Sequence, residues 1–252
     1  MAADRAPSLP RRLLAEGLGT ALLVAVVVGS GIAAQRLSPS DTGLQLLENS
    51  LATALALTVL IAWLGPVSGA HFNPAVSLAA WWWGRPGGER PGTGLDGRDV
   101  PPYVAAQLAG GLAGSVLAAA MFELPLVDVS TTERVGSGTL VGEVVATFGL
   151  VALVGALVAG RREHLAAPLV GAYIGAAYWW TSSTSFANPA VTLGRSITDT
   201  FAGIAPSSVP PFVLAQLVGA TLALAAIAVL HPVRDTDALV PPHDHAAEES
   251  HA

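Results

Sequence analysis

The 252-residue chain contains no cysteine, no lysine and few charged residues of any kind. The missing cysteines exclude disulfides, thiolate metal sites and a cysteine nucleophile. Because lysine is absent, all twelve basic residues are arginines. Charged residues make up 12% of the chain, about half the share of a soluble domain, while 52% of residues are hydrophobic and mean hydropathy is +0.57. This composition indicates a protein of the lipid bilayer.

The net charge of −6 is concentrated near the C-terminus. From Arg234 onward a single arginine stands among five carboxylates: Asp235, Asp237, Asp244, Glu248 and Glu249. Residues 232–252 contain little that a core could bury, so we predict a disordered, acidic tail with histidines. Metal binding or pH sensing by those histidines is the alternative. Elsewhere nothing resembles a metal-ligand cluster or a basic partner surface, so no metal, cofactor or nucleic-acid partner is expected.

Six apolar stretches are long enough to cross a bilayer. They cover residues 13–34, 45–64, 102–122, 138–159, 166–184 and 209–230. Two further apolar segments, 74–83 and 189–198, have about ten residues each and are too short to span. The sequence therefore predicts an all-α membrane protein with six transmembrane helices and two re-entrant half-helices.

Each short segment begins with the same triplet. Asn73-Pro74-Ala75 and Asn188-Pro189-Ala190 lie 115 residues apart in near copies of one nonapeptide. Asparagine is a strong helix N-cap and proline is tolerated at the first helical position, so each triplet starts a helix. At membrane depth such a start presents unpaired N–H groups, a positive dipole end and an asparagine amide to a passing solute. Two ordinary capped helices are the alternative.

The two triplets belong to an internal repeat. The order span, span, half-helix, span occurs over about residues 13–122 and again over 138–231. Three spans per repeat invert the second repeat in the membrane, which brings the two half-helix starts to the interface between repeats. With residues 1–12 cytoplasmic, nine arginines fall inside and three outside, which satisfies the positive-inside rule. We therefore expect both termini in the cytoplasm and a multi-pass protein of the inner (plasma) membrane.

Over residues 11–231 the sequence resembles the major intrinsic protein family, the aquaporins and glycerol facilitators. The resemblance rests on the two triplets, on residues 68–71 and on boxes around Glu16, Glu143, Gln107 and Gln216. It implies an aquaporin-like bundle with one pore per subunit, usually a homotetramer, in which Asn73 and Asn188 face the pore. It also implies that Glu16, Glu143 and His71 are structural polar residues, and that both carboxylates accept hydrogen bonds from the half-helix loops.

The selectivity filter departs from the family pattern. Water- and glycerol-selective members place an arginine directly after the second triplet, where this chain has Val191. Counting from the motifs, the other filter positions are Thr53, Ala176 and Ser185. None of the four is a large aromatic residue, a histidine or a charged residue, so we expect a wide, uncharged constriction. Arg195 lies one helical turn beyond Val191 and is a candidate for lining the outer mouth of the pore. The alternative is that it donates hydrogen bonds to loop carbonyls and holds the outer loop in place.

A wide filter suits small uncharged solutes, so the expected function is a passive channel and not an enzyme. Residues 184–203 resemble a bacterial branch associated with arsenic-resistance genes, which implies arsenite, As(OH)3, as a candidate solute. The other candidates are polyols such as glycerol, and a channel that conducts mainly water. A secondary transporter remains an alternative, although only Glu16 and Glu143 are available as ionisable groups within the spans.

Overall fold

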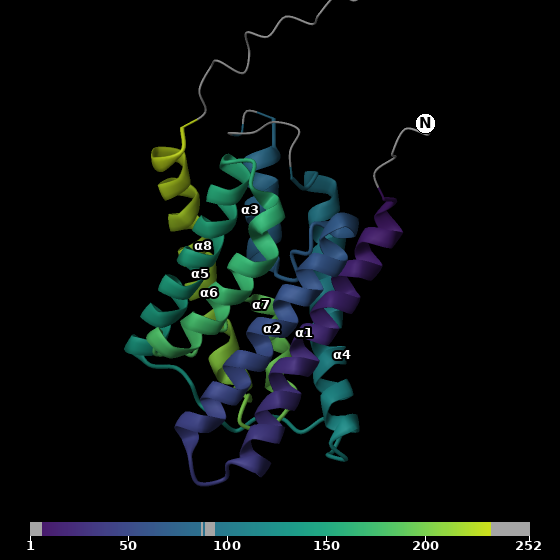
Figure 1. Ribbon diagram of the computed structural model, residues 1–252, viewed down its shortest axis with the longest axis vertical. Coiled ribbons are helices and arrows are strands. Elements are labelled where there is room, and N and C mark those ends of the chain that lie inside the picture. Colours follow the sequence, from purple (N-terminus) through teal and green to yellow (C-terminus); the bar gives the residue numbers. More distant parts are fainter. Residues whose placement is uncertain (1–6, 87, 89–93, 233–252) are drawn as a thin grey trace, which may run out of the picture.

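The computed structural model describes residues 7–86, 88 and 94–232, and within these ranges the chain is helical without strands (Figure 1). The helices are α1 (Leu9–Leu37), α2 (Thr42–Ser68), α3 (Pro74–Gly84), α4 (Val100–Met121), α5 (Ser137–Ala159), α6 (Ala166–Trp180), α7 (Pro189–Gly194) and α8 (Val209–Leu230). Four 3-10 turns accompany them: η1 (Gly97–Asp99), η2 (Glu163–Leu165), η3 (Arg195–Ile197) and η4 (Pro206–Ser208). The prediction of an all-α fold is confirmed, and the tail prediction lies outside the described residues.

Five helical segments of the described chain are long and apolar enough to span a membrane: α1, α2, η1 with α4, α5, and η4 with α8. The predicted fifth span, 166–184, is corrected. Its helix α6 has 15 residues and ends at Trp180. Thr181 is extended, and Thr184 and Ser185 have φ angles of 61° and 52°, which no helix accommodates. The end of this apolar stretch therefore belongs to the loop that carries the second triplet.

The first and last spans of each repeat approach closely at a glycine. A Cβ added to Gly110 of α4 would lie 2.3 Å from the Gly17 carbonyl oxygen of α1, and one added to Gly219 of α8 would lie 2.3 Å from the Val144 carbonyl oxygen of α5. Both distances are far inside van der Waals contact, so only glycine permits these helix crossings. The two contacts follow Glu16 and Glu143 directly in sequence.

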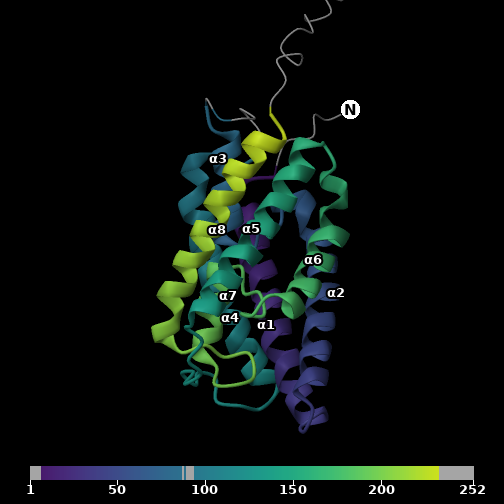
Figure 2. The same ribbon diagram turned by 90° about the vertical axis from the view of Figure 1, so that its left-hand side faces the viewer.

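The two half-helices enter the bundle between the repeats. α3 lies in the upper half of the bundle and α7 below it, and α1 begins and α8 ends at the upper end (Figures 1 and 2). Contacts cross the repeats, since α7 of the second repeat packs against α4 of the first and α3 contacts α8. The triplets at the starts of α3 and α7 are therefore brought to the middle of the molecule.

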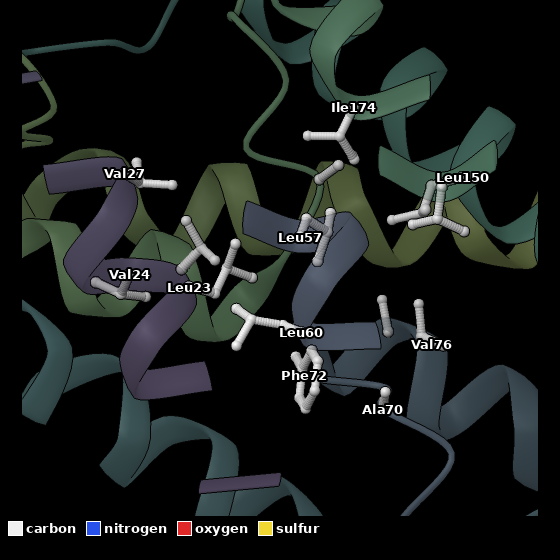
Figure 3. Close-up of a cluster of buried hydrophobic side chains, with 14 of the residues drawn as sticks. Leu23, Val24, Val27, Leu57, Leu60, Ala70, Phe72, Val76, Leu150 and Ile174 are labelled. Atoms are coloured by element: carbon white, nitrogen blue, oxygen red, sulfur yellow. The ribbon is translucent and has the colours of Figure 1, made fainter. Parts of the chain in front are cut away.

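A buried apolar cluster surrounds the first half-helix loop (Figure 3). It includes Leu23, Val24, Val27, Leu57, Leu60, Ala70, Phe72, Val76, Leu150 and Ile174. Phe72, 1% exposed, stands directly before the first triplet. A Cβ on Gly19 would lie 2.0 Å from Phe72 Cε1, so the ring packs directly on the backbone of α1. This packing fixes the loop from the apolar side.

Candidate functional site

Asn73 and Asn188 hold each other's loops in place. Asn73 Nδ2 donates a hydrogen bond to the Ala187 carbonyl oxygen at 2.8 Å, and Asn188 Nδ2 donates to the Phe72 carbonyl oxygen at 2.8 Å. Each Oδ1 accepts from the N–H of the alanine in its own triplet, at 2.9 Å in both cases. Because an amide nitrogen carries two hydrogens, each asparagine retains one N–H for a solute.

The backbone before each triplet is held in a left-handed conformation. Ala70 and Phe72 have φ angles of 50° and 48° before the first triplet, and Ser185 and Ala187 have 52° and 47° before the second. Such angles are uncommon for residues other than glycine and persist only where the surroundings enforce them. The loops turn their backbone N–H groups toward one buried carboxylate each.

Glu16 and Glu143 are those carboxylates, and both are fully buried. Glu16 accepts from the N–H groups of His71 and Phe72 at 3.0 and 2.7 Å, and from Ser68 Oγ at 2.7 Å. Glu143 accepts from the N–H groups of Phe186 and Ala187, both at 2.9 Å. Among the described residues Arg12 pairs with Asp99, at 2.7 Å, and not with Glu16. The carboxylates are placed to hold the two loops.

Two glutamines complete the hydrogen-bond network and were not among the predicted site residues. Gln107 Nε2 donates to Glu16 at 2.7 Å and to Ser77 Oγ at 2.8 Å. Gln216 Nε2 donates to Glu143 at 2.6 Å and to Thr192 Oγ1 at 2.8 Å. Each glutamine ties a carboxylate to a hydroxyl on the adjacent half-helix. Their recurrence at matching repeat positions was visible in the sequence, but their partners were not.

His71 shares the first of these networks. Its Nδ1 lies 3.0 Å from Ser77 Oγ, and its ring lies 5.7 Å from that of Tyr103, centroid to centroid. Tyr103 in turn donates to the Ser68 carbonyl oxygen at 3.0 Å, which closes the turn after α2. His71 is therefore both a loop residue and part of the cavity wall described next.

A cavity of about 560 Å³ runs past both asparagines. Its wall is mostly apolar, with side chains from α1, α2, α3, α5 and α6, and several of these are shown in Figure 3. Its polar members are Thr53, His71, Asn73, Tyr178, Ser185, Asn188 and Arg195, with Glu163 and His164 at the end where α6 begins. Of the triplets only the asparagines line the cavity, because Pro74, Ala75, Pro189 and Ala190 are buried in the starts of the half-helices. The cavity is therefore an apolar passage with a sparse set of polar groups.

Three of the four predicted filter residues line this cavity, and the fourth is wrong. Thr53, Ser185 and Val191 are buried in the wall, whereas Ala176 is exposed on the outside of α6. Tyr178, two residues further, lines the cavity, and its Oη lies 3.3 Å from Thr53 Oγ1. Two residues correspond to about 200° around a helix, so Ala176 and Tyr178 point to opposite sides. The prediction of Ala176 failed because the positions were counted back from the second triplet through the irregular loop after Trp180.

The cavity wall also carries charge, whereas the sequence predicted an uncharged constriction. Arg195, the first residue of η3, is 4% exposed and lines the same cavity as Val191. Its Nε donates to the Ala202 carbonyl oxygen, and its Cζ lies 3.5 Å from the centroid of the Phe186 ring. An aromatic residue, Tyr178, thus lines the cavity where the sequence suggested Ala176, and Arg195, which the sequence offered as a candidate for the outer mouth, lines it as well.

Loops at the lower end of the bundle are held together by two carboxylates outside the spans. Asp199 accepts from Thr131 N and Thr131 Oγ1, both at 3.0 Å, and these hydrogen bonds lower the pKa of Asp199. Glu133 accepts from Ser207 and Ser208 hydroxyls at 2.7 and 2.8 Å, which lowers the pKa of Glu133. Among the described residues no group of three or more His, Asp or Glu side chains is arranged to hold a metal ion.

Two half-helices that meet start to start at a cavity within a bundle of apolar helices define a membrane channel for small neutral solutes. The family model described as Major intrinsic protein matches residues 4–186, and the chain belongs to that family. The resemblance inferred from the triplets is therefore confirmed.

Several relatives agree with this assignment. The chain is 53% identical over 229 residues to aquaglyceroporin AqpS of Rhizobium meliloti (strain 1021), covering 90% of this chain and 93% of that protein. It is 29% identical over 248 residues to aquaporin AqpM of Methanothermobacter marburgensis, covering 86% and 95%. The structure of the aquaglyceroporin from Plasmodium falciparum superposes with a TM-score of 0.65 at 19% identity, covering 86% of this chain and 95% of that one. These relatives bear the names of channels and not of enzymes.

Proposed function

We propose that this channel conducts small uncharged hydroxylated solutes, namely polyols such as glycerol and the polyol mimic arsenite, As(OH)3. The observation that carries the proposal is the apolar cavity with few, spaced polar groups. A polyol has a carbon face and a hydroxyl face, and such a wall accommodates both at once. The name of the relative from Rhizobium meliloti, aquaglyceroporin, supports the same solute class.

Within the cavity the retained N–H groups of Asn73 and Asn188 donate to the solute's oxygens. Thr53, Tyr178 and Ser185 supply hydroxyls further along the same wall. Ser185 Oγ is buried without a hydrogen-bond partner within the described residues, so a small rotation makes it available to a passing hydroxyl. The positive ends of both half-helices point at this centre and oppose cations.

The test is stopped-flow light scattering on proteoliposomes that contain the purified channel. Glycerol and arsenite gradients should each produce swelling that is linear in solute concentration and unaffected by ion gradients. A matched preparation of Asn188→Leu, which removes the central donor, should reduce both fluxes. Water permeation without glycerol or arsenite flux in the native channel would reject the proposal.

A mainly water-conducting channel is the second candidate, and one observation favours it. Tyr178 lines the cavity in place of Ala176, and Arg195 lines it beside Val191, so the passage is narrower than a filter of Thr, Ala, Ser and Val alone would be. The same flux measurements decide, because a water channel passes water while excluding glycerol. A coupled transporter is disfavoured, since the carboxylates of Glu16 and Glu143 are engaged by the loops and glutamines.

We further propose that the protein lies in the inner membrane with its termini in the cytoplasm and assembles as a homotetramer. The described arginines support this orientation. Arg11, Arg12, Arg85, Arg98, Arg161 and Arg162 belong to segments at the end where α1 begins, and Arg36, Arg134 and Arg195 to segments at the opposite end. Because the chain has no cysteine, single substitutions can be labelled selectively. Ser207→Cys should react with an impermeant maleimide on intact spheroplasts, and Ser8→Cys should react only after lysis.

A further inference from the structure

We propose that Arg195, pinned on the ring of Phe186, supplies the cation-excluding charge of the pore that Val191 does not provide. This inference deepens the proposed function, because it assigns a selectivity role within the same cavity. It begins from position. Arg195 follows Val191 by four residues, so both lie on one face of the second half-helix, and both line the cavity.

The guanidinium of Arg195 is buried and forms no direct ion pair among the described residues, although the Glu143 carboxylate lies within electrostatic range. The ion pairs among the described residues join Arg12 to Asp99 and Arg98 to Asp96, and neither involves Arg195. Arg134 lies on the same aromatic ring, with its Cζ 5.3 Å from the Phe186 centroid, and therefore adds positive charge. A buried charge is normally paired or functional, because burial removes it from water. The charge of Arg195 is thus retained at the cavity wall.

The contacts that hold Arg195 leave its donors available. Its hydrogen bond within the described part of the chain uses Nε, which donates to the Ala202 carbonyl oxygen. The two terminal nitrogens carry four of the five N–H groups of a guanidinium. The Phe186 ring, 3.5 Å from Cζ, supports the flat face of the group by a cation–π contact. The N–H groups at the guanidinium edge are thus left for a solute oxygen.

Phe186 is itself fixed by the second loop. Its N–H donates to Glu143 at 2.9 Å, and its ring packs edge-on against Phe212 at a centroid distance of 5.3 Å. Arg195 is therefore held by the same loop that carries Asn188. The arrangement places a rigid positive charge on the route to the paired asparagines, where it repels cations and donates to the hydroxyls of neutral solutes.

The alternative is that Arg195 only secures the outer loop through Ala202. A variant that cancels the charge without removing Arg195 separates the two roles. Val191→Glu places a carboxylate four residues before Arg195, the spacing at which a helical ion pair forms, and leaves the contacts of Arg195 intact. Val191→Gln is the matched neutral variant of similar size.

The experiment measures sodium entry into proteoliposomes loaded with a sodium-sensitive dye, with glycerol flux on the same vesicles. We expect Val191→Glu to raise sodium entry about tenfold or more over Val191→Gln, because one charge close to the ion path is cancelled. Arg195→Gln should raise it similarly, and Arg195→Lys should restore the low leak. Arg36→Gln is the control, since Arg36 lies on the Phe122 ring at 5.2 Å and does not line the cavity.

Equal sodium entry for Val191→Glu and Val191→Gln would overturn the proposal, as would a folded Arg195→Gln channel with the native leak. If Arg195→Gln does not fold, the Val191 pair alone decides. The sodium comparison does not depend on which neutral solute passes. Failure of glycerol and arsenite flux in the native channel would therefore reject the proposed function and leave this result standing.

Discussion

The two half-helix loops share one scaffold and differ in what surrounds it. In each, a buried carboxylate accepts two backbone N–H groups of the loop and a glutamine side chain, and the glutamine also reaches a hydroxyl on the half-helix. A serine hydroxyl also donates to each carboxylate, Ser68 in the first loop and Ser183 in the second, and the first loop adds His71 and Tyr103 to this centre. The second adds instead Phe186 with two arginines on its ring.

The half-helices that follow the loops differ as well. α3 continues for 11 residues to Gly84, whereas α7 ends after six residues and passes into the 3-10 turn that begins with Arg195. Arg195 stands at this change and lines the cavity wall. The comparison teaches that the repeats share the element that positions the asparagines, while the arginine at the cavity wall, Arg195, belongs to the second repeat.

Removing either buried carboxylate should give the largest loss of stability, of similar size in the two repeats. Glu16→Ala and Glu143→Ala each leave two loop N–H groups and one serine hydroxyl without their acceptor, Ser68 in the first case and Ser183 in the second, and remove one of the two acceptors of the glutamine. Each loss should cost about 3 kcal/mol or more, since every buried unpaired donor costs about 1–3 kcal/mol. Thermal aggregation of the detergent-solubilised protein measures this, with the exposed Glu123→Ala as control. A Glu16→Ala protein as stable as the control would contradict the scaffold.

The helix crossings next to those carboxylates should respond alike in the two repeats. Gly110→Ala and Gly219→Ala each place a Cβ 2.3 Å from a carbonyl oxygen of the facing helix. Overpacking of this kind should destabilise each variant by about 1–3 kcal/mol. Gly17→Ala is the matched control on the same interface, because its Cβ would lie 3.5 Å from the Ala106 carbonyl oxygen. The temperature of half-aggregation should fall for the first two and remain native for the third; a native value for either crossing variant would refute the close contact.

Selectivity should change in the second repeat at Tyr178 and not at Ala176. Tyr178→Ala removes an aromatic ring from the cavity wall, so glycerol flux per channel should rise several-fold. Ala176→Leu adds a side chain on the exposed face of α6 and should leave the flux at its native value. Vesicle swelling with protein content normalised tests both. The reverse pattern would restore Ala176 to the filter and remove Tyr178 from it.

The smallest effect concerns pH and the outer loops. Hydrogen bonds from Thr131 lower the pKa of Asp199 from its ordinary value of 3.8, so the folded state favours the ionised carboxylate. The resulting stabilisation is fully present above that ordinary value and is lost as the pH falls through the lowered folded value. Native protein should therefore lose thermal stability on acidification in this range more than Asp199→Asn does. Parallel curves of thermal stability against pH for the native protein and Asp199→Asn would show that Asp199 contributes nothing to this pH dependence.

The sequence predicted the fold where the signals are local. Asparagine followed by proline starts a helix by its own chemistry, so Asn73 and Asn188 were assigned without a structure. Their side chains cap α3 and α7 as that chemistry requires. Long apolar runs likewise revealed the spans, because a bilayer imposes their length.

The filter could not be predicted in the same way. Residues 181–187 form an irregular loop, and a position counted back through such a loop has no fixed relation to the face of the helix before it. Ala176 was chosen in this manner, and Tyr178 was missed. The spacing of Val191 and Arg195 lay within one half-helix, so the shared face was readable. That Phe186 would hold the guanidinium depended on tertiary contact, which spacing does not encode.

The reciprocal hydrogen bonds of the asparagines also bear on how the protein is made. Asn73 Nδ2 donates to an acceptor 114 residues later in the chain, and Asn188 Nδ2 donates to one 116 residues earlier. During synthesis the first four helices therefore leave the ribosome before the partner of Asn73 exists. The centre of the channel closes only when the second half has been inserted, so maturation is a late, single event. Two fragments divided within the connection between α4 and α5 should recover a channel when expressed together, and neither should do so alone.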